Sequence, residues 1–225
     1  HTAFMGKAFS SDGDEFNYYF YDLNAKVKHK FNDRSRLFLS FYHGKDHYHY
    51  NFKESYGISD CYESKNGLNW GNTIVAGRWN YVFTNKLFSN TTVAFNSYRM
   101  ILKGRAKEEN IYSSSQSYFY HYDSEYRSGI RDWSFRTDFD YTPIPSHHIK
   151  FGVEYLYHTF RPETNTSKMK EEENGVTEQD TLYNSISNSY LHGHEASVYA
   201  EDNFDIGSRT SLNAGVHISL FNTQG

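Results

Sequence analysis

The sequence predicts an all-β fold: an antiparallel up-and-down transmembrane β-barrel, of which this chain supplies about eight strands. Three observations lead to this fold class. Apolar and polar residues alternate with a period of two along most of the chain, short turns alternate with long polar connections, and aromatic residues make up 19% of the sequence although the mean hydropathy is −0.80. Because a barrel strand turns only every second side chain toward lipid, low mean hydropathy is compatible with a membrane wall.

The alternation marks the strands, and it is clearest over residues 131–141. There Trp133, Phe135 and Phe139 share one face, and Arg136 and Asp138 share the other. The predicted strands form four hairpins and cover residues 19–27, 37–42, 72–83, 87–102, 131–141, 149–157, 196–204 and 212–220. Apart from residues 37–42, these ranges span 9–16 residues, so they exceed the ~5–6 of globular sheets and suffice for the ~9–11 needed to cross a bilayer.

The connections differ in length in a regular way. Those within hairpins are short and cover residues 32–35, 84–86, 142–147 and 207–208. Those between hairpins are predicted to be long polar loops over residues 44–70, 104–128 and 161–194. Strict alternation places the short turns at one end and the long loops at the other, as in outer-membrane barrels, where the long loops are external.

The polar face of the strands is predicted to line the lumen, and the apolar face to meet lipid. The lumen-facing side chains would include Lys26, Arg78, Arg136, Asp138 and Glu154. In a soluble sandwich the same polar face would simply be solvated, and the pattern alone leaves both arrangements open. Interfacial girdles are expected near strand ends, at Tyr18, Tyr19, Trp70, Tyr81, Tyr141 and Tyr157.

Several functional classes find no support in the residues. A net charge of −4 argues against a nucleic-acid partner. The absence of a Gly-x-Ser-x-Gly motif and of a glycine-rich phosphate loop argues against an enzyme. The single cysteine, Cys61, rules out an intramolecular disulfide and a multi-cysteine zinc site. We therefore predict no catalytic residues, no cofactor and no metal.

Two groups of residues are candidates for binding a ligand. They are His47, Tyr48 and His49 in one segment, and His192 and His194 in another. Histidines two positions apart on a strand share a face, and they are placed at predicted loop-side strand ends, where a haem or metal complex would be met. The alternative is that they are polar tips in a girdle or loop.

Four stretches resemble the barrel of TonB-dependent outer-membrane receptors of the Bacteroidetes type. They are residues 20–35, 129–133, 139–143 with 148–152, and 199–204. The resemblance extends over essentially the whole chain, through barrel patterns and not catalytic signatures. It implies a 22-stranded barrel in the bacterial outer membrane, a plug domain, energy coupling to the TonB complex, and import of a large nutrient such as a siderophore, corrinoid, glycan or peptide.

The chain departs from that family in lacking the plug, the TonB box and a terminal aromatic strand residue. Residues 1–225 are therefore expected to be one segment of the barrel domain, completed by the rest of the receptor chain and surrounded by outer-membrane lipid. An open wall of about eight strands would leave two unpaired edges in lipid. Two alternatives stay open: a small self-closed eight-stranded barrel, and a soluble β-sandwich with a glycan-binding or structural role.

Overall fold

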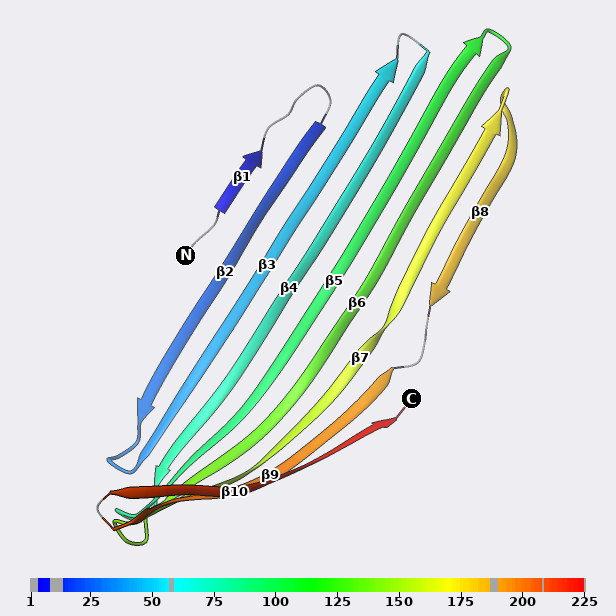
Figure 1. Ribbon diagram of the computed structural model, residues 1–225. Helices are drawn as coiled ribbons and strands as arrows, with labels where there is room; N and C mark the ends of the chain where they lie inside the picture. The colour runs from blue at the N-terminus through cyan, green and yellow to red at the C-terminus, as the bar shows by residue number, and fades with distance from the viewer. Residues whose placement is uncertain (1–3, 9–13, 57–58, 187–189, 208, 225) are drawn as a thin grey trace.

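A computed structural model describes residues 4–8, 14–56, 59–186, 190–207 and 209–224, and these form one antiparallel sheet of ten strands (Figure 1). The strands are β1 (Phe4–Ala8), β2 (Asp14–Lys30), β3 (Ser35–Tyr56), β4 (Asp60–Val82), β5 (Leu87–Ser113), β6 (Gln116–Tyr141), β7 (His147–Glu173), β8 (Val176–Ile186), β9 (Leu191–Ile206) and β10 (Thr210–Gln224). Among the described residues, no helix has the length and apolar character needed to cross a membrane.

Sequential strands are neighbours, which confirms the all-β, antiparallel, up-and-down prediction. The order runs from β1 through β7 to β9 and β10, while β8 pairs with β7 alone. β9 pairs with the first part of β7, over residues 147–160, and β8 pairs with the last part, over residues 164–173. β7 thus changes partner partway along, close to a register shift against β6 between Arg127 and Gly129.

The prediction of three long loops is wrong. β3 continues to Tyr56 and β4 begins at Asp60, β5 ends at Ser113 and β6 begins at Gln116, and β7 continues to Glu173 before a turn into β8. Both faces of these segments carry polar residues, so their sequence lacks the contrast that reveals a strand. Backbone hydrogen bonds to the strands on both sides hold these segments extended, and local composition does not reveal such pairing.

The short turns lie where the sequence places them. Residues 31–34, 83–86 and 142–146 join β2–β3, β4–β5 and β6–β7, and Gly207 begins the fourth turn at a φ of 70°. Residue 208 of that turn lies outside the described part of the chain. These turns gather at the lower end of the sheet in Figure 1, and the turns at 114–115 and 174–175 lie at the upper end, where β3 ends and β4 begins.

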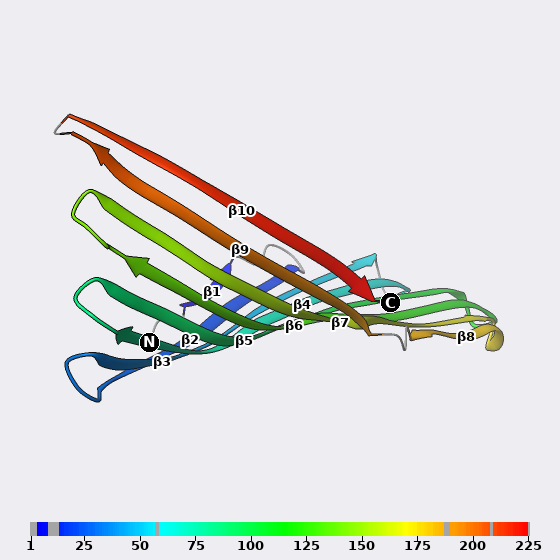
Figure 2. The ribbon, with the colours of Figure 1, turned by 90° about the horizontal axis from the view of Figure 1, so that it is seen from below.

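The predicted number and length of strands need correction. The described residues form ten strands instead of about eight, because β1 and β8 were not predicted, and β5 and β7 reach 27 residues each. The sheet is one layer and is not a closed barrel. Figure 2 shows it curving so that β9 and β10 rise away from β2–β4, and β1 does not pair with β10.

Candidate functional site

One face of the lower half of the sheet carries an exposed apolar belt. The belt residues are Leu23, Ala25, Val27, Leu37, Leu39, Phe41, Val75, Trp79, Val93, Phe95, Trp133, Phe135, Phe139, Phe151, Val153, Val198, Val216, Ile218 and Leu220. Within the described residues no hydrophobic side chain is buried, and Leu39, Trp133 and Val216 are 50%, 54% and 61% exposed. We use "belt face" for this side of the sheet and "polar face" for the other.

The belt residues contact one another across strands. The rings of Phe139 and Phe151 stack with centroids 5.0 Å apart, and those of Phe95 and Trp133 lie 4.8 Å apart. At the lower edge the Trp79 indole donates a hydrogen bond from Nε1 to Ser35 Oγ at 2.9 Å. The belt is therefore a continuous apolar surface, far larger than the isolated hydrophobic residues that soluble proteins usually expose.

The belt slants across the sheet. The apolar run on β2 ends at its lower edge with Val27, and the run on β10 ends at its upper edge with Leu220. Yet Val27 and Leu220 lie in one hydrogen-bonded row, through Leu39, Gly77, Val93, Phe135, Tyr155 and Ala196. Between β2 and β10 the apolar run thus shifts along the strands by about eight residues, roughly 27 Å, while the sheet between them is about 34 Å wide. The strands are therefore tilted by about 40° from the perpendicular to the belt.

Of the histidine candidates, His192 and His194 lie at the upper edge of this belt, whereas His47 and His49 lie six and eight residues above Phe41 on β3. His47 stacks on Tyr19 with centroids 4.7 Å apart. The hydroxyls of Tyr157 and Tyr155 are hydrogen-bonded to Nδ1 of His192 and His194, each at 2.8 Å. In each of these contacts a histidine ring lies against a tyrosine of a neighbouring strand.

The two histidine groups are not brought together. His47 and His49 lie within β3, whereas His192 and His194 begin β9, with β4 to β7 between them. Tyr48 points to the opposite, polar face, where it contacts Phe16 with ring centroids 5.3 Å apart. No group of three or more His, Cys, Asp or Glu side chains in the described ranges is placed to hold a metal ion.

The polar candidates Lys26, Arg78, Arg136, Asp138 and Glu154 share the polar face, as the alternation predicts. Arg136 Nε donates to both oxygens of Asp138 at 3.0 and 2.9 Å, and its Nη1 lies 3.8 Å from Glu154 Oε2.

The sequence prediction missed Tyr199, whose hydroxyl donates to Asp138 Oδ1 at 2.6 Å. A Cβ on Gly152 would lie 2.7 Å from the Tyr199 ring, so only glycine lets the ring reach Asp138. Tyrosine beside glycine on adjacent strands is the available sequence signal, but it requires the register to be known.

The polar face of the upper half combines tyrosines with carboxylates. One hydrogen-bonded row reads Glu54, Tyr62, Glu108, Tyr120, Glu171 across β3 to β7. We name this row, together with seven residues of the same face that lie up to eight residues from it along the strands, the tyrosine–acid surface; the seven are Tyr18, Asp46, Tyr48, Tyr50, Trp70, Tyr118 and Tyr122. The sequence did not reveal this surface, because most of its residues lie in segments that were predicted to be loops.

Hydrogen bonds within the tyrosine–acid surface orient its rings. Tyr18 donates to Asp46 Oδ1 at 2.6 Å and stacks on Trp70 with centroids 6.3 Å apart. The hydrogen bond to Asp46 raises the pKa of Tyr18, and burial adds to that rise. Burial and a hydrogen bond to Glu171 raise the pKa of Tyr118. Carboxylate acceptors, phenol hydroxyls and exposed ring faces together suit a ligand with hydroxyl or cationic groups.

Two of the predicted girdle residues therefore need correction. Tyr18 and Trp70 belong to the polar face, whereas Tyr19, Tyr81, Tyr141 and Tyr157 lie on the belt face. The one-residue step from Tyr18 to Tyr19 crosses the sheet, since successive strand residues point to opposite sides.

Comparison with known protein families and with curated proteins finds no match to this chain.

Proposed function

We propose that this chain forms part of the wall of a bacterial outer-membrane barrel, in a TonB-dependent importer of a large nutrient. The observation that carries the proposal is the belt: a contiguous apolar surface on a sheet with no buried hydrophobic side chain among the described residues. Such a surface needs a cover, and lipid covers the outside of a membrane barrel.

The shape of the belt favours lipid over a second protein layer. On β6 it runs from Trp133 to Tyr141, about nine residues, which is the length of a strand that crosses hydrocarbon. Its slant of about 40° matches the ~35–45° at which barrel strands cross a membrane. Aromatic residues follow both edges, as in interfacial girdles. A soluble sandwich does not require such a slanted border.

The open edges favour a wider barrel over a small self-closed one. Every strand in the described order pairs only with its neighbours, and the curved sheet keeps β1 and β10 apart (Figure 2). Unpaired strand edges in lipid leave backbone groups without partners at a cost of several kcal/mol each. Further strands of the receptor would complete the wall, and the plug and the TonB complex would supply the energy.

In this proposal the polar face lines the lumen and the tyrosine–acid surface captures the nutrient. The upper strands extend well beyond the belt, so their polar face forms a vestibule outside the membrane. Its carboxylates and tyrosines favour a glycan or a cationic peptide over an anionic nutrient. The role is binding and passage, and no residue of the wall acts as a catalyst.

Vesicle flotation tests the membrane placement. Mixed with phosphatidylcholine vesicles, the chain should float with them, require detergent in their absence, and migrate on gels in a heat-modifiable way. Phe135→Arg with Phe139→Arg should abolish flotation, while Asp138→Ala on the polar face should not. A chain that stays dispersed in water without detergent would favour the soluble sandwich.

Nutrient uptake tests the capture role. In the receptor that contains this wall, Glu54→Gln, Glu108→Gln and Glu171→Gln together should reduce uptake of the true nutrient among siderophores, corrinoids, glycans and peptides. The matched control removes three carboxylates from the belt face of the upper half, with Glu63→Gln, Glu109→Gln and Glu172→Gln. Equal effects of both sets would contradict capture by the tyrosine–acid surface.

A further inference from the structure

A row of cations crosses the belt face just above the apolar belt. Lys45 on β3, Arg99 on β5 and Arg161 on β7 lie in one hydrogen-bonded row, separated by Gly71 on β4 and Gly129 on β6. We name these three side chains the cationic row. Because neighbouring strands are about 4.8 Å apart, successive cations are roughly 10 Å apart at the backbone.

The two glycines let the cations converge. A Cβ on Gly71 would lie 3.5 Å from Lys45 Cγ, and one on Gly129 would lie 3.8 Å from Arg161 Cδ. The stems of Lys45 and Arg161 therefore lie over the glycines, toward the strand that carries Arg99. A side chain at either glycine would fill the space between neighbouring cations.

Among the side chains that the structure describes, no carboxylate lies in the two rows that flank the cationic row. The rows directly above and below it on β3 to β7 consist of His47, Asn69, Ile101, Arg127 and Thr164, and of His43, Thr73, Ser97, Arg131 and Thr159. Within the described residues Lys45, Arg99 and Arg161 form no ion pair, and Arg161 Nε is buried without a hydrogen-bond partner. The three like charges repel one another, and an anion bound between them would relieve that repulsion.

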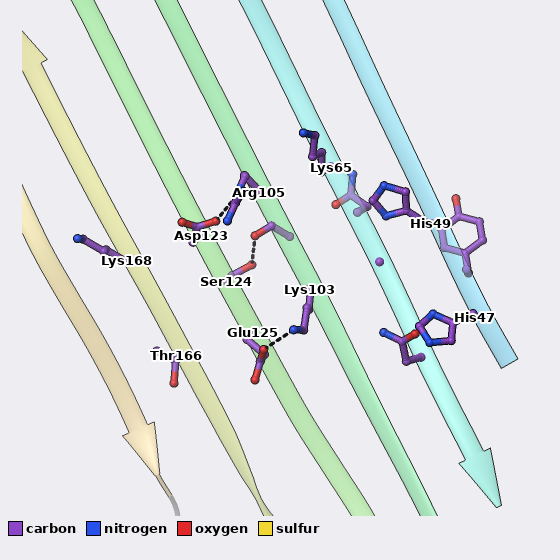
Figure 3. A pocket seen from close by; sticks show the side chains of 15 residues that line it. His47, His49, Lys65, Lys103, Arg105, Asp123, Ser124, Glu125, Thr166 and Lys168 are labelled. Atoms are coloured by element: carbon purple, nitrogen blue, oxygen red, sulfur yellow. Dashed lines mark hydrogen bonds and ion pairs between the residues drawn. The ribbon is translucent and has the colours of Figure 1, made fainter. Parts of the chain in front are cut away.

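Two basic residues higher on the same face form ion pairs with carboxylates. In the depression shown in Figure 3, Arg105 Nε lies 2.6 Å from Asp123 Oδ1 and Lys103 Nζ lies 3.0 Å from Glu125 Oε2. These charges are neutralised within the protein.

The position of the row identifies the anion as part of a lipid. On each of the three strands the cation comes four positions above an aromatic residue at the upper border of the belt: Phe41, Phe95 and Tyr157. Because the belt slants by about 40°, the row spans roughly 12 Å of height between β3 and β7. That range crosses the border between hydrocarbon and headgroups, where basic residues attract anionic lipids. Arg and Lys both bind phosphate oxygens with charge-assisted hydrogen bonds.

We propose that the cationic row is a binding site for phosphate-bearing lipid, with phosphates over Gly71 and Gly129 and acyl chains along the belt. The site rests on the membrane placement made in the proposed function, but not on nutrient import. A free phosphate ion would meet the same three charges without gaining the apolar contacts below them.

Lipid competition tests the site. The chain in neutral detergent is given equal amounts of phosphatidylglycerol and phosphatidylcholine with identical acyl chains, and the lipids retained are counted by native mass spectrometry. We expect a preference for phosphatidylglycerol of roughly tenfold. It should vanish in the triple variant Lys45→Gln, Arg99→Gln, Arg161→Gln, and persist in Lys45→Arg, Arg99→Lys, Arg161→Lys.

The matched control removes the same charge from the other face, with Lys26→Gln, Arg78→Gln and Lys150→Gln, and should keep the preference. Equal retention of both lipids by the unmodified chain, or an equal loss in this control, would overturn the site while leaving the membrane placement intact. Displacement of phosphatidylglycerol by inorganic phosphate at similar concentration would assign the row to a soluble anion and overturn the lipid proposal. Failure to retain either lipid would overturn the membrane placement as well.

Discussion

The lower and upper halves of the same strands differ in how polar and apolar residues are divided between the two faces. In the lower half, one face is apolar and the other polar, so each strand is visible as a period-two pattern. In the upper half both faces are polar, yet β3 to β7 continue without interruption. A difference in polarity between the two faces therefore reveals a strand in the sequence, whereas hydrogen-bonded pairing with strands on both sides keeps it extended.

Protease access would show the largest difference between the halves. A cleavage site inserted at residues 114–115 should be cut by protease added outside intact cells, and one inserted at residues 84–86 should not. The paired strand over residues 168–173 should resist, because the extended backbone is hydrogen-bonded to β6 and β8. Cleavage at the lower turn alone would invert the orientation.

An arginine in the belt should be costly, and the same change above the belt should not. Phe139→Arg near the bilayer centre should lower the free energy of unfolding from vesicles by roughly 2–4 kcal/mol. Phe119→Arg, on the same face of the same strand in the upper half, should change it by less than about 0.5 kcal/mol. Similar costs at both positions, measured in urea titrations, would remove the distinction between the halves.

Two glycines give a smaller contrast. A Cβ on Gly152 in the lower half would lie 2.6 Å from the Thr137 carbonyl oxygen, whereas one on Gly67 in the upper half would be 3.8 Å from its nearest neighbour. Gly152→Ala should therefore destabilise by about 1–3 kcal/mol. Gly67→Ala should be neutral or slightly stabilising, because it reduces the freedom of the unfolded chain. Thermal unfolding in detergent measures both changes.

Acid should loosen the upper half before the belt, and this is the smallest effect. A hydrogen bond from Lys65 lowers the pKa of Glu63. Burial alone would raise the pKa of Glu125, but hydrogen bonds from Lys103 and Arg127 outweigh it and lower the pKa. A carboxyl with a lowered pKa in the folded protein adds stability above its unfolded pKa, and that stability is lost as the pH falls through the folded value.

We therefore expect protease resistance of the upper strands to decrease below the ordinary pKa range of glutamate, while flotation with vesicles stays unchanged. Glu63→Gln with Glu125→Gln should reduce this pH dependence. Simultaneous loss of resistance and flotation would mean that the halves do not unfold separately.

The sequence by itself determined which side chains share a face in the lower half, including Arg136 with Asp138 and Phe135 with Phe139, and it placed the turns that join those strands. Both are local properties, because the two-residue period and the turn residues can be recognised from consecutive positions in the sequence. The upper strands, the shared edge of β7, the contact of Tyr199 with Asp138 and the row of Lys45, Arg99 and Arg161 were decided only by the tertiary structure. Each depends on the register between strands far apart in the chain, and a shift of one residue would move every side chain to the other face.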